Sequence, residues 1–216
     1  MTIAGALVIP AAPVQLPEYV GLADPAAAIR ERSIALVREA LGHNDIDRVV
    51  LVSGHEREPR HTKGAVGIRV ARLIVAAAGW TGPIEEIVVP FDARAEEVAQ
   101  AGADLAAGGR ALLVCAADLS AKRTEKAPGH LDERAAGVDA VALAALSAGD
   151  AGALVALDAD LCAQVWLTGR AALQVLTTLV PEPANPAVLW SEDPYGVLYV
   201  LARWHGEQPG LATLGD

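Results

Sequence analysis

RALLVCAAD (110–118) is apolar at every position between its charged ends, and it is followed at once by the polar, basic LSAKR (119–123). A strand with apolar side chains at successive positions is covered on both faces, which is typical of parallel sheets flanked by helices. Further runs predict five more strands. They are GALVIP (5–10), RVVLVSG (48–54), EEIVVP (85–90), AVLWSED (187–193) and GVLYVLARW (196–204).

Amphipathic segments separate these strands. Asp24 as N-cap, Pro25 at the first position and Gly42 as the stop predict one helix. Residues 66–79 and 93–109 predict two more, and 134–180 predict two or three Ala/Leu-rich helices broken near Asp150 and Gly169. This alternation predicts a three-layer α/β fold: one domain over 1–206, with a mainly parallel sheet and helices on both faces, and a tail at 207–216.

Composition excludes several classes of function. The formal net charge of −10 argues against binding to nucleic acid or to an anionic membrane surface, because both need a basic surface. No apolar run approaches the roughly 18 residues of a membrane span. Cys115 and Cys162 lack CxxC spacing, which favours free thiols in a reducing compartment. We therefore expect a cytoplasmic protein, and a homo-oligomer remains open.

Cations gather in two loops that follow predicted strands. These residues are His55, Arg57, Arg60, His61 and Lys63 in the first loop and Lys122, Arg123, Lys126 and His130 in the second. In open α/β sheets the ligand crevice lies outside the carboxyl ends of the strands. A local positive field at that edge predicts a small anionic ligand, such as a carboxylate or phosphate ester. The alternative is that these are solvated loops whose charges offset those of neighbouring acids.

Four segments carry a family resemblance. ALVIPAAPVQLPE, LVSGH, LVCAADLSAKRT and LWSEDPYGVLYVLA occur in this order along nearly the whole chain. In order and spacing the chain resembles the LigB-like class III extradiol ring-cleavage dioxygenases and their MEMO-like relatives, and it looks closest to Ala-rich, actinobacterial-type members. The resemblance implies the phosphorylase/hydrolase-like α/β fold of that superfamily.

The same resemblance implies a site for Fe(II) or another divalent metal, held by two histidines and a carboxylate, with a further histidine as acid and base. His55 and Glu192 match one histidine ligand and the carboxylate ligand. Ala11 stands at the other ligand position and Ala121 at the acid/base position. A methyl group neither ligates a metal nor moves a proton, and His55 and Glu192 alone would make a weak two-ligand site, to which His61 or Asp118 could add a third ligand.

We therefore expect a LigB-like pseudoenzyme with an incomplete metal site, which binds a small anionic molecule without standard dioxygenase activity. The expected ligand-binding residues are His55, Arg57, Asp118, Ser120, Lys122, Arg123, Trp190 and Tyr195, and the candidate catalytic residues are His55, Lys122 and His130. Two alternatives stay open. One is an Fe(II)-dependent extradiol dioxygenase, an oxidoreductase, with a rearranged metal shell around His55 and Glu192. The other is a non-catalytic scaffold or accessory subunit.

Overall fold

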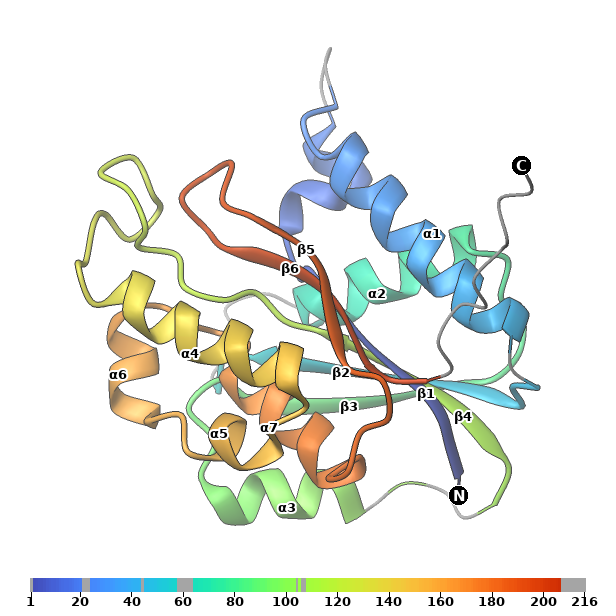
Figure 1. Ribbon diagram of the computed structural model, residues 1–216. Helices are drawn as coiled ribbons and strands as arrows, with labels where there is room; N and C mark the ends of the chain where they lie inside the picture. Colours follow the sequence, from blue (N-terminus) through green and yellow to red (C-terminus); the bar gives the residue numbers. More distant parts are fainter. Residues whose placement is uncertain are drawn as a thin grey trace, which may run out of the picture.

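The computed structural model describes residues 2–20, 24–43, 45–57, 64–103, 105 and 108–206. Its strands are β1 (Thr2–Ile9), β2 (Arg48–His55), β3 (Ile84–Pro90), β4 (Arg110–Ala116), β5 (Ala187–Glu192) and β6 (Tyr199–His205). They form one sheet in the order β3-β2-β4-β1-β6-β5 (Figure 1). The first four strands are parallel, whereas β6 is antiparallel to β1 and β5 is antiparallel to β6. The prediction of an α/β fold with a mainly parallel sheet is confirmed.

Helices cover both faces of this sheet (Figure 1). The α-helices are α1 (Ala27–His43), α2 (Val66–Ala77), α3 (Ala95–Ala103), α4 (Ala135–Ala148), α5 (Ala151–Val155), α6 (Ala159–Gln164) and α7 (Arg170–Leu179), and two short 3-10 helices are η1 (Pro13–Gln15) and η2 (Pro17–Tyr19). Helices α1 and α2 pack on one face, and α3 to α7 pack on the other. The molecule therefore has three layers.

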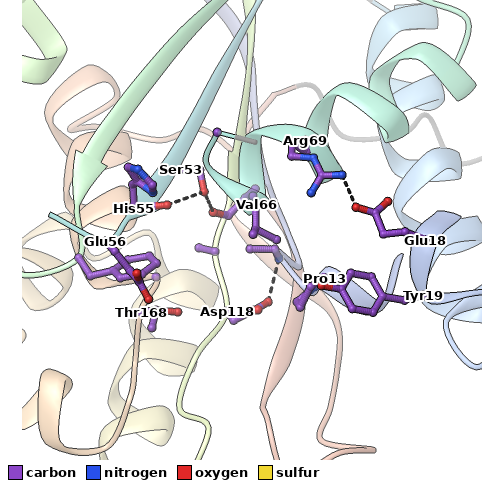
Figure 2. A pocket seen from close by; sticks show the side chains of 18 residues that line it. Pro13, Glu18, Tyr19, Ser53, His55, Glu56, Val66, Arg69, Asp118 and Thr168 are labelled. Carbon is purple, nitrogen blue, oxygen red and sulfur yellow. Dashed lines mark hydrogen bonds and ion pairs between the residues drawn. The ribbon is translucent and has the colours of Figure 1, made fainter. Parts of the chain in front are cut away.

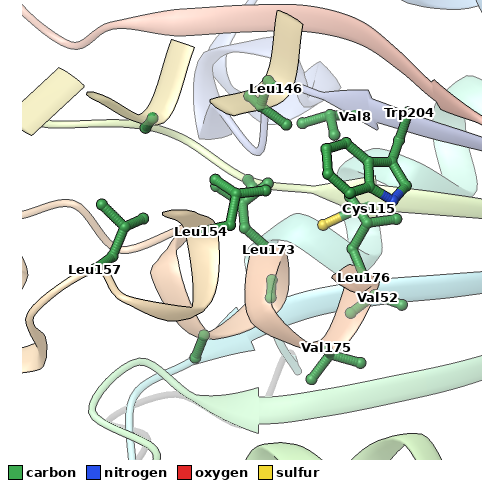
Figure 3. Close-up of a cluster of buried hydrophobic side chains, with 14 of the residues drawn as sticks. Val8, Val52, Cys115, Leu146, Leu154, Leu157, Leu173, Val175, Leu176 and Trp204 are labelled. Atoms are coloured by element: carbon green, nitrogen blue, oxygen red, sulfur yellow. The ribbon is translucent and has the colours of Figure 1, made fainter. Parts of the chain in front are cut away.

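The central strands are buried from both sides. In β2, Val50 and Val52 belong to the core cluster beneath α3 to α7, whereas Val49 and Leu51 belong to the cluster beneath α1 and α2. Successive side chains of a strand point to opposite faces, so a continuously apolar strand is stable only between two helical layers. Figure 3 shows the first of these clusters, in which the indole Nε1 of Trp204 donates to a backbone carbonyl at 2.9 Å.

Residues 134–180 form four helices, so the expectation of two or three is wrong. The expected breaks occur, because Asp150 caps α5 and Gly169 precedes α7. The additional break comes at Asp158, whose carboxylate accepts a hydrogen bond of 2.7 Å from the backbone N–H of Leu161 and so caps α6. Alanine raises helix propensity on both sides of this position, which hides the break in the sequence pattern. The tail expected at 207–216 lies outside the described residues.

The two cysteines are buried free thiols, as expected. Burial raises the pKa of Cys162 to about 11 and raises that of Cys115 above its usual range. Because the thiolate is the reactive form, neither cysteine is a candidate nucleophile at neutral pH.

No helix in the described part of the chain is both long enough and apolar enough to cross a bilayer.

Candidate functional site

The topology of the sheet opens a crevice at the carboxyl end of β4. From β1 and β2 the chain continues into α1 and α2 on one face, whereas from β4 it continues into α4 on the opposite face. Strand β4 lies between β2 and β1 in the sheet. The connections therefore diverge on both sides of β4, which is where open α/β sheets bind their ligands.

A cavity of about 630 Å³ occupies this position (Figure 2). Its volume is within the range of about 300–1,000 Å³ that is usual for small-molecule sites. Its walls come from the segments that follow β1, β2, β3 and β4, from the first turns of α2, and from the residues before α7. The polar lining residues are Glu18, Tyr19, Ser53, His55, Glu56, Arg69, Asp118 and Thr168.

Asp118 lies in the middle of this lining, with His55 and Glu56 to one side and Pro13 and Tyr19 to the other (Figure 2). Burial of its carboxyl group raises the pKa to about 7, and a hydrogen bond that the backbone N–H of Ala11 donates to Oδ1 at 2.8 Å only partly offsets this effect. The carboxyl group therefore holds its proton more tightly than an exposed aspartate does.

Backbone contacts fix Asp118 in the cavity. The N–H of Ala117 donates to the carbonyl of Ile9 at 2.9 Å, which ties the end of β4 to the end of β1. The N–H of Gly169 donates to the Asp118 carbonyl at 2.9 Å. A Cβ on Gly169 would lie 2.5 Å from that carbonyl oxygen, so only glycine permits this approach.

Helix α2 packs closely against the strands that border the cavity. Ser53 is buried at the end of β2, and its hydroxyl donates to the carbonyl of Ala116 at 3.2 Å. A Cβ on Gly67 would lie 2.0 Å from the Ser53 hydroxyl and 3.2 Å from the Cβ of Ala11. The absence of a side chain at Gly67 therefore lets the first turn of α2 border the cavity directly.

The outer wall of the cavity carries charges. Arg69 of α2 forms an ion pair with Glu18 of η2 (Figure 2). Tyr19 and Glu56 are exposed residues of the same lining. The described lining thus contains three acidic residues and one arginine, and the arginine is already paired with one of the acids.

Among the residues expected to bind a ligand, His55 and Asp118 line the cavity. Arg57 does not line it, because its guanidinium group pairs with Glu97 at 2.9 Å and with Asp92 at 3.2 Å. These two carboxylates raise the pKa of Arg57 above its already high value. Arg60, His61 and Lys63, expected to contribute cations from the same loop, lie outside the described residues.

Lys122 and Arg123 are also absent from the described cavity lining. The Lys122 ammonium lies over the ring of Trp166, 5.6 Å from its centroid. Arg123 donates to Asp139 at 2.9 Å and to Asp193 at 2.6 Å. The structure therefore does not bring these two cations together with His55, although the anion-binding expectation depended on that grouping.

Ser120 belongs to the same interaction network as Arg123. Its hydroxyl and its N–H donate to the Asp139 carboxylate at 2.6 and 2.9 Å. Both Ser120 and Asp139 are fully buried. This network fastens the loop after β4 to α4 and to the turn between β5 and β6, so Ser120 has a structural role away from the cavity.

The remaining candidates also lie elsewhere. Trp190 packs among residues of α1 and β6, with Arg32 5.7 Å from its ring centroid. Tyr195 donates to the carbonyl of Pro25 at 2.9 Å and borders a second, more open hollow of about 490 Å³. His130 is exposed in the loop after β4. None of these three is among the described residues that line the main cavity.

The two expected metal ligands do not both line the cavity. His55 borders the cavity, whereas Glu192 is exposed at the end of the edge strand β5 and is absent from the described lining. Across the described ranges, no three His, Cys, Asp or Glu side chains come together as a metal site would require. The donor set of the described residues therefore does not fit an Fe(II) centre of the two-histidine, one-carboxylate type.

Several lining residues were not singled out from the sequence. Glu18, Tyr19 and Arg69 belong to η2 and α2, and Phe91 and Thr168 follow β3 and precede α7. Proline spacing in PVQLPEY (13–19) signals the turns that carry Glu18 and Tyr19. Nothing in the local pattern around Arg69 or Phe91 distinguishes these residues from other helix and loop positions.

No protein-family model matches this chain, and no curated protein sequence matches it.

Proposed function

We propose that the protein binds a small organic molecule in the cavity at the carboxyl ends of β1, β2 and β4. One observation carries this proposal: the cavity lies at the divergence of the strand connections and encloses a desolvated carboxyl group, Asp118, that has no cationic partner among the described residues. Largely apolar cavities with a few convergent polar groups are the usual form of small-molecule sites.

We further propose that the chain has a LigB-like fold and lacks the standard iron-dependent ring cleavage. Three of the four segments that carry the resemblance meet at the cavity through Ala11, His55 and Asp118. Ala11 stands in the lining where the resemblance implies a ligand histidine, and Ala121 lies outside that lining. A metal-bound oxygenation would need donors that these positions do not supply.

Fragment binding to the ¹⁵N-labelled protein tests this proposal by NMR. We expect neutral and charged aromatic fragments to shift the amide signals of Ala11, Gly67, Ala117 and Gly169, all of which border the cavity. The variant Val66→Trp places a large ring at the cavity wall from a side chain that is 40% exposed, and it should weaken binding about tenfold or more.

The matched control is Val88→Trp. Val88 is 44% exposed on β3 and is absent from the described cavity lining, so the same substitution should leave binding unchanged. Fragments that shift no cavity amide, or that bind equally well to both variants, would contradict the proposal. In that case the scaffold alternative would be favoured.

A further inference from the structure

The charges of the described cavity lining indicate a class of ligand. We infer that the ligand carries a cationic nitrogen, an ammonium or amidinium group, that pairs with the carboxylate of Asp118. This inference rests on the proposed small-molecule site and assigns the sign of charge that the site accepts. It differs from the anion expected from the sequence, because Lys122 and Arg123, two of the cations on which that expectation depended, are absent from the described cavity lining and have other partners.

Asp118 is a desolvated acid of the described lining that has no cationic partner among the described residues. Oδ1 accepts one hydrogen bond from the Ala11 N–H, and within the described residues no arginine, lysine or histidine pairs with either oxygen. Burying a carboxylate without a cation is costly, and the group responds by holding its proton more tightly. A cation bound beside it would recover the lost interaction and restore the charged form.

The nearby arginines are engaged with other acids. Arg69, the arginine of the described lining, forms its ion pair with Glu18. Arg57 is held by Asp92 and Glu97 outside the lining. Neither pairing brings a guanidinium group to Asp118, so among the residues that the structure describes its carboxylate is available to a ligand.

The rest of the described lining also disfavours an anion. Glu56 adds a second carboxylate to the side of the cavity that His55 occupies (Figure 2). Tyr19 and Phe91 contribute aromatic rings, whose negative faces attract cations. A ligand carboxylate would meet like charges at Asp118 and Glu56, whereas an ammonium group would meet opposite charge and aromatic surface.

Three probes with the same ring and different charges test the inference: benzylammonium, benzyl alcohol and benzoate. We expect wild-type protein at pH 8 to bind benzylammonium about tenfold or more tightly than benzyl alcohol, and benzoate most weakly, in NMR titrations of the cavity amides. The variant Asp118→Asn keeps the shape of the side chain and removes its charge. It should abolish the preference for benzylammonium and retain the binding of benzyl alcohol.

Glu182→Gln is the matched control, because Glu182 is an exposed acid that is absent from the described cavity lining. It should retain the preference for benzylammonium. Equal binding of the three probes by wild type, or tighter binding of benzoate, would overturn the inference and leave the small-molecule site standing. Absence of any cavity shift with all three probes would overturn the proposed site as well. The wild-type comparison tests the inference even if Asp118→Asn fails to fold.

Discussion

Asp118 lines the cavity, and its ionised carboxylate destabilises the folded state. Its carboxyl group is desolvated in the cavity, and the single hydrogen bond from Ala11 does not compensate for this. Burial of Tyr199 raises the pKa of its hydroxyl group above the usual range, and the negative charge of Asp118 adds to this shift. The pKa of an ordinary aspartate is 3.8, whereas that of Asp118 in the folded protein is about 7. Between these two pH values Asp118 binds more protons in the folded state than in the unfolded state. The contribution of Asp118 to the free energy of unfolding therefore falls as pH rises from about 4 to about 7.

Replacing Asp118 with asparagine should remove this pH dependence. We expect Asp118→Asn to resemble wild type near pH 4 and to be more stable by about 2–4 kcal/mol at pH 8, because the amide carries no charge to desolvate. Urea unfolding at a series of pH values measures the difference. Glu56→Gln, at an exposed position, should leave the pH profile unchanged. An Asp118→Asn variant less stable than wild type at pH 8 would show that the carboxylate is compensated in the folded state.

At the scale of elements, one buried network holds the loop after β4 in place. Asp139 is a lone acid in the apolar helix α4 and is fully buried. It accepts hydrogen bonds from Ser120 and Arg123, and Arg123 continues the network to Asp193 at the turn between β5 and β6. The Leu119 N–H also donates to the carbonyl of Leu198 at 3.0 Å. This network anchors the segment that begins at Asp118, so the cavity depends on it.

Asp139 and Asp193 should therefore differ in their contribution to stability. We expect Asp139→Asn to lower the free energy of unfolding by about 2–4 kcal/mol, because it removes the charge that faces the partly buried Arg123 and replaces the oxygen that accepts from Arg123 and Ser120 with an N–H donor. The Asp193 side chain is 40% exposed, so Asp193→Asn should cost less than about 1 kcal/mol. Urea unfolding of both variants at pH 7 measures the difference. Equal losses, or a stable Asp139→Asn variant, would mean that the loop is held by other contacts.

The sequence predicts the strands better than the helices, and the reason is physical. RALLVCAAD and RVVLVSG are apolar on both faces, and this pattern has few stable solutions other than a covered parallel strand. In the Ala-rich residues 134–180, most positions are compatible with a helix. The sequence pattern therefore does not reveal that α6 begins separately after Asp158.

For the candidate site, the position of a residue at the end of a strand predicted cavity lining, whereas the clustering of charged residues did not. His55 ends β2 and Asp118 follows β4, two parallel strands that end at the same edge of the sheet, and both residues line the cavity. Lys122 and Arg123 occur only a few residues later, but their directions are set by Trp166 and Asp139, which come from distant parts of the sequence. Such nonlocal partners are not visible in a local sequence pattern.

At the scale of the whole molecule, a three-layer fold places a cavity where the connections of a parallel sheet diverge. We propose that this cavity accepts an organic ligand through Asp118 and its aromatic and apolar walls, without a metal. The rival hypothesis is the rearranged metal shell around His55 and Glu192. Glu192 is absent from the described cavity lining, and no three His, Cys, Asp or Glu side chains of the described residues come together.

The most direct test is the metal content of protein purified anaerobically with iron, zinc and manganese supplied, combined with benzylammonium binding before and after chelation. Wild type, His55→Ala and Glu192→Ala would be compared. We predict metal far below one ion per chain in all three proteins, and binding to wild type that is unchanged by the chelator. Near-stoichiometric metal that both substitutions abolish, together with probe binding that disappears on chelation, would contradict a metal-free site.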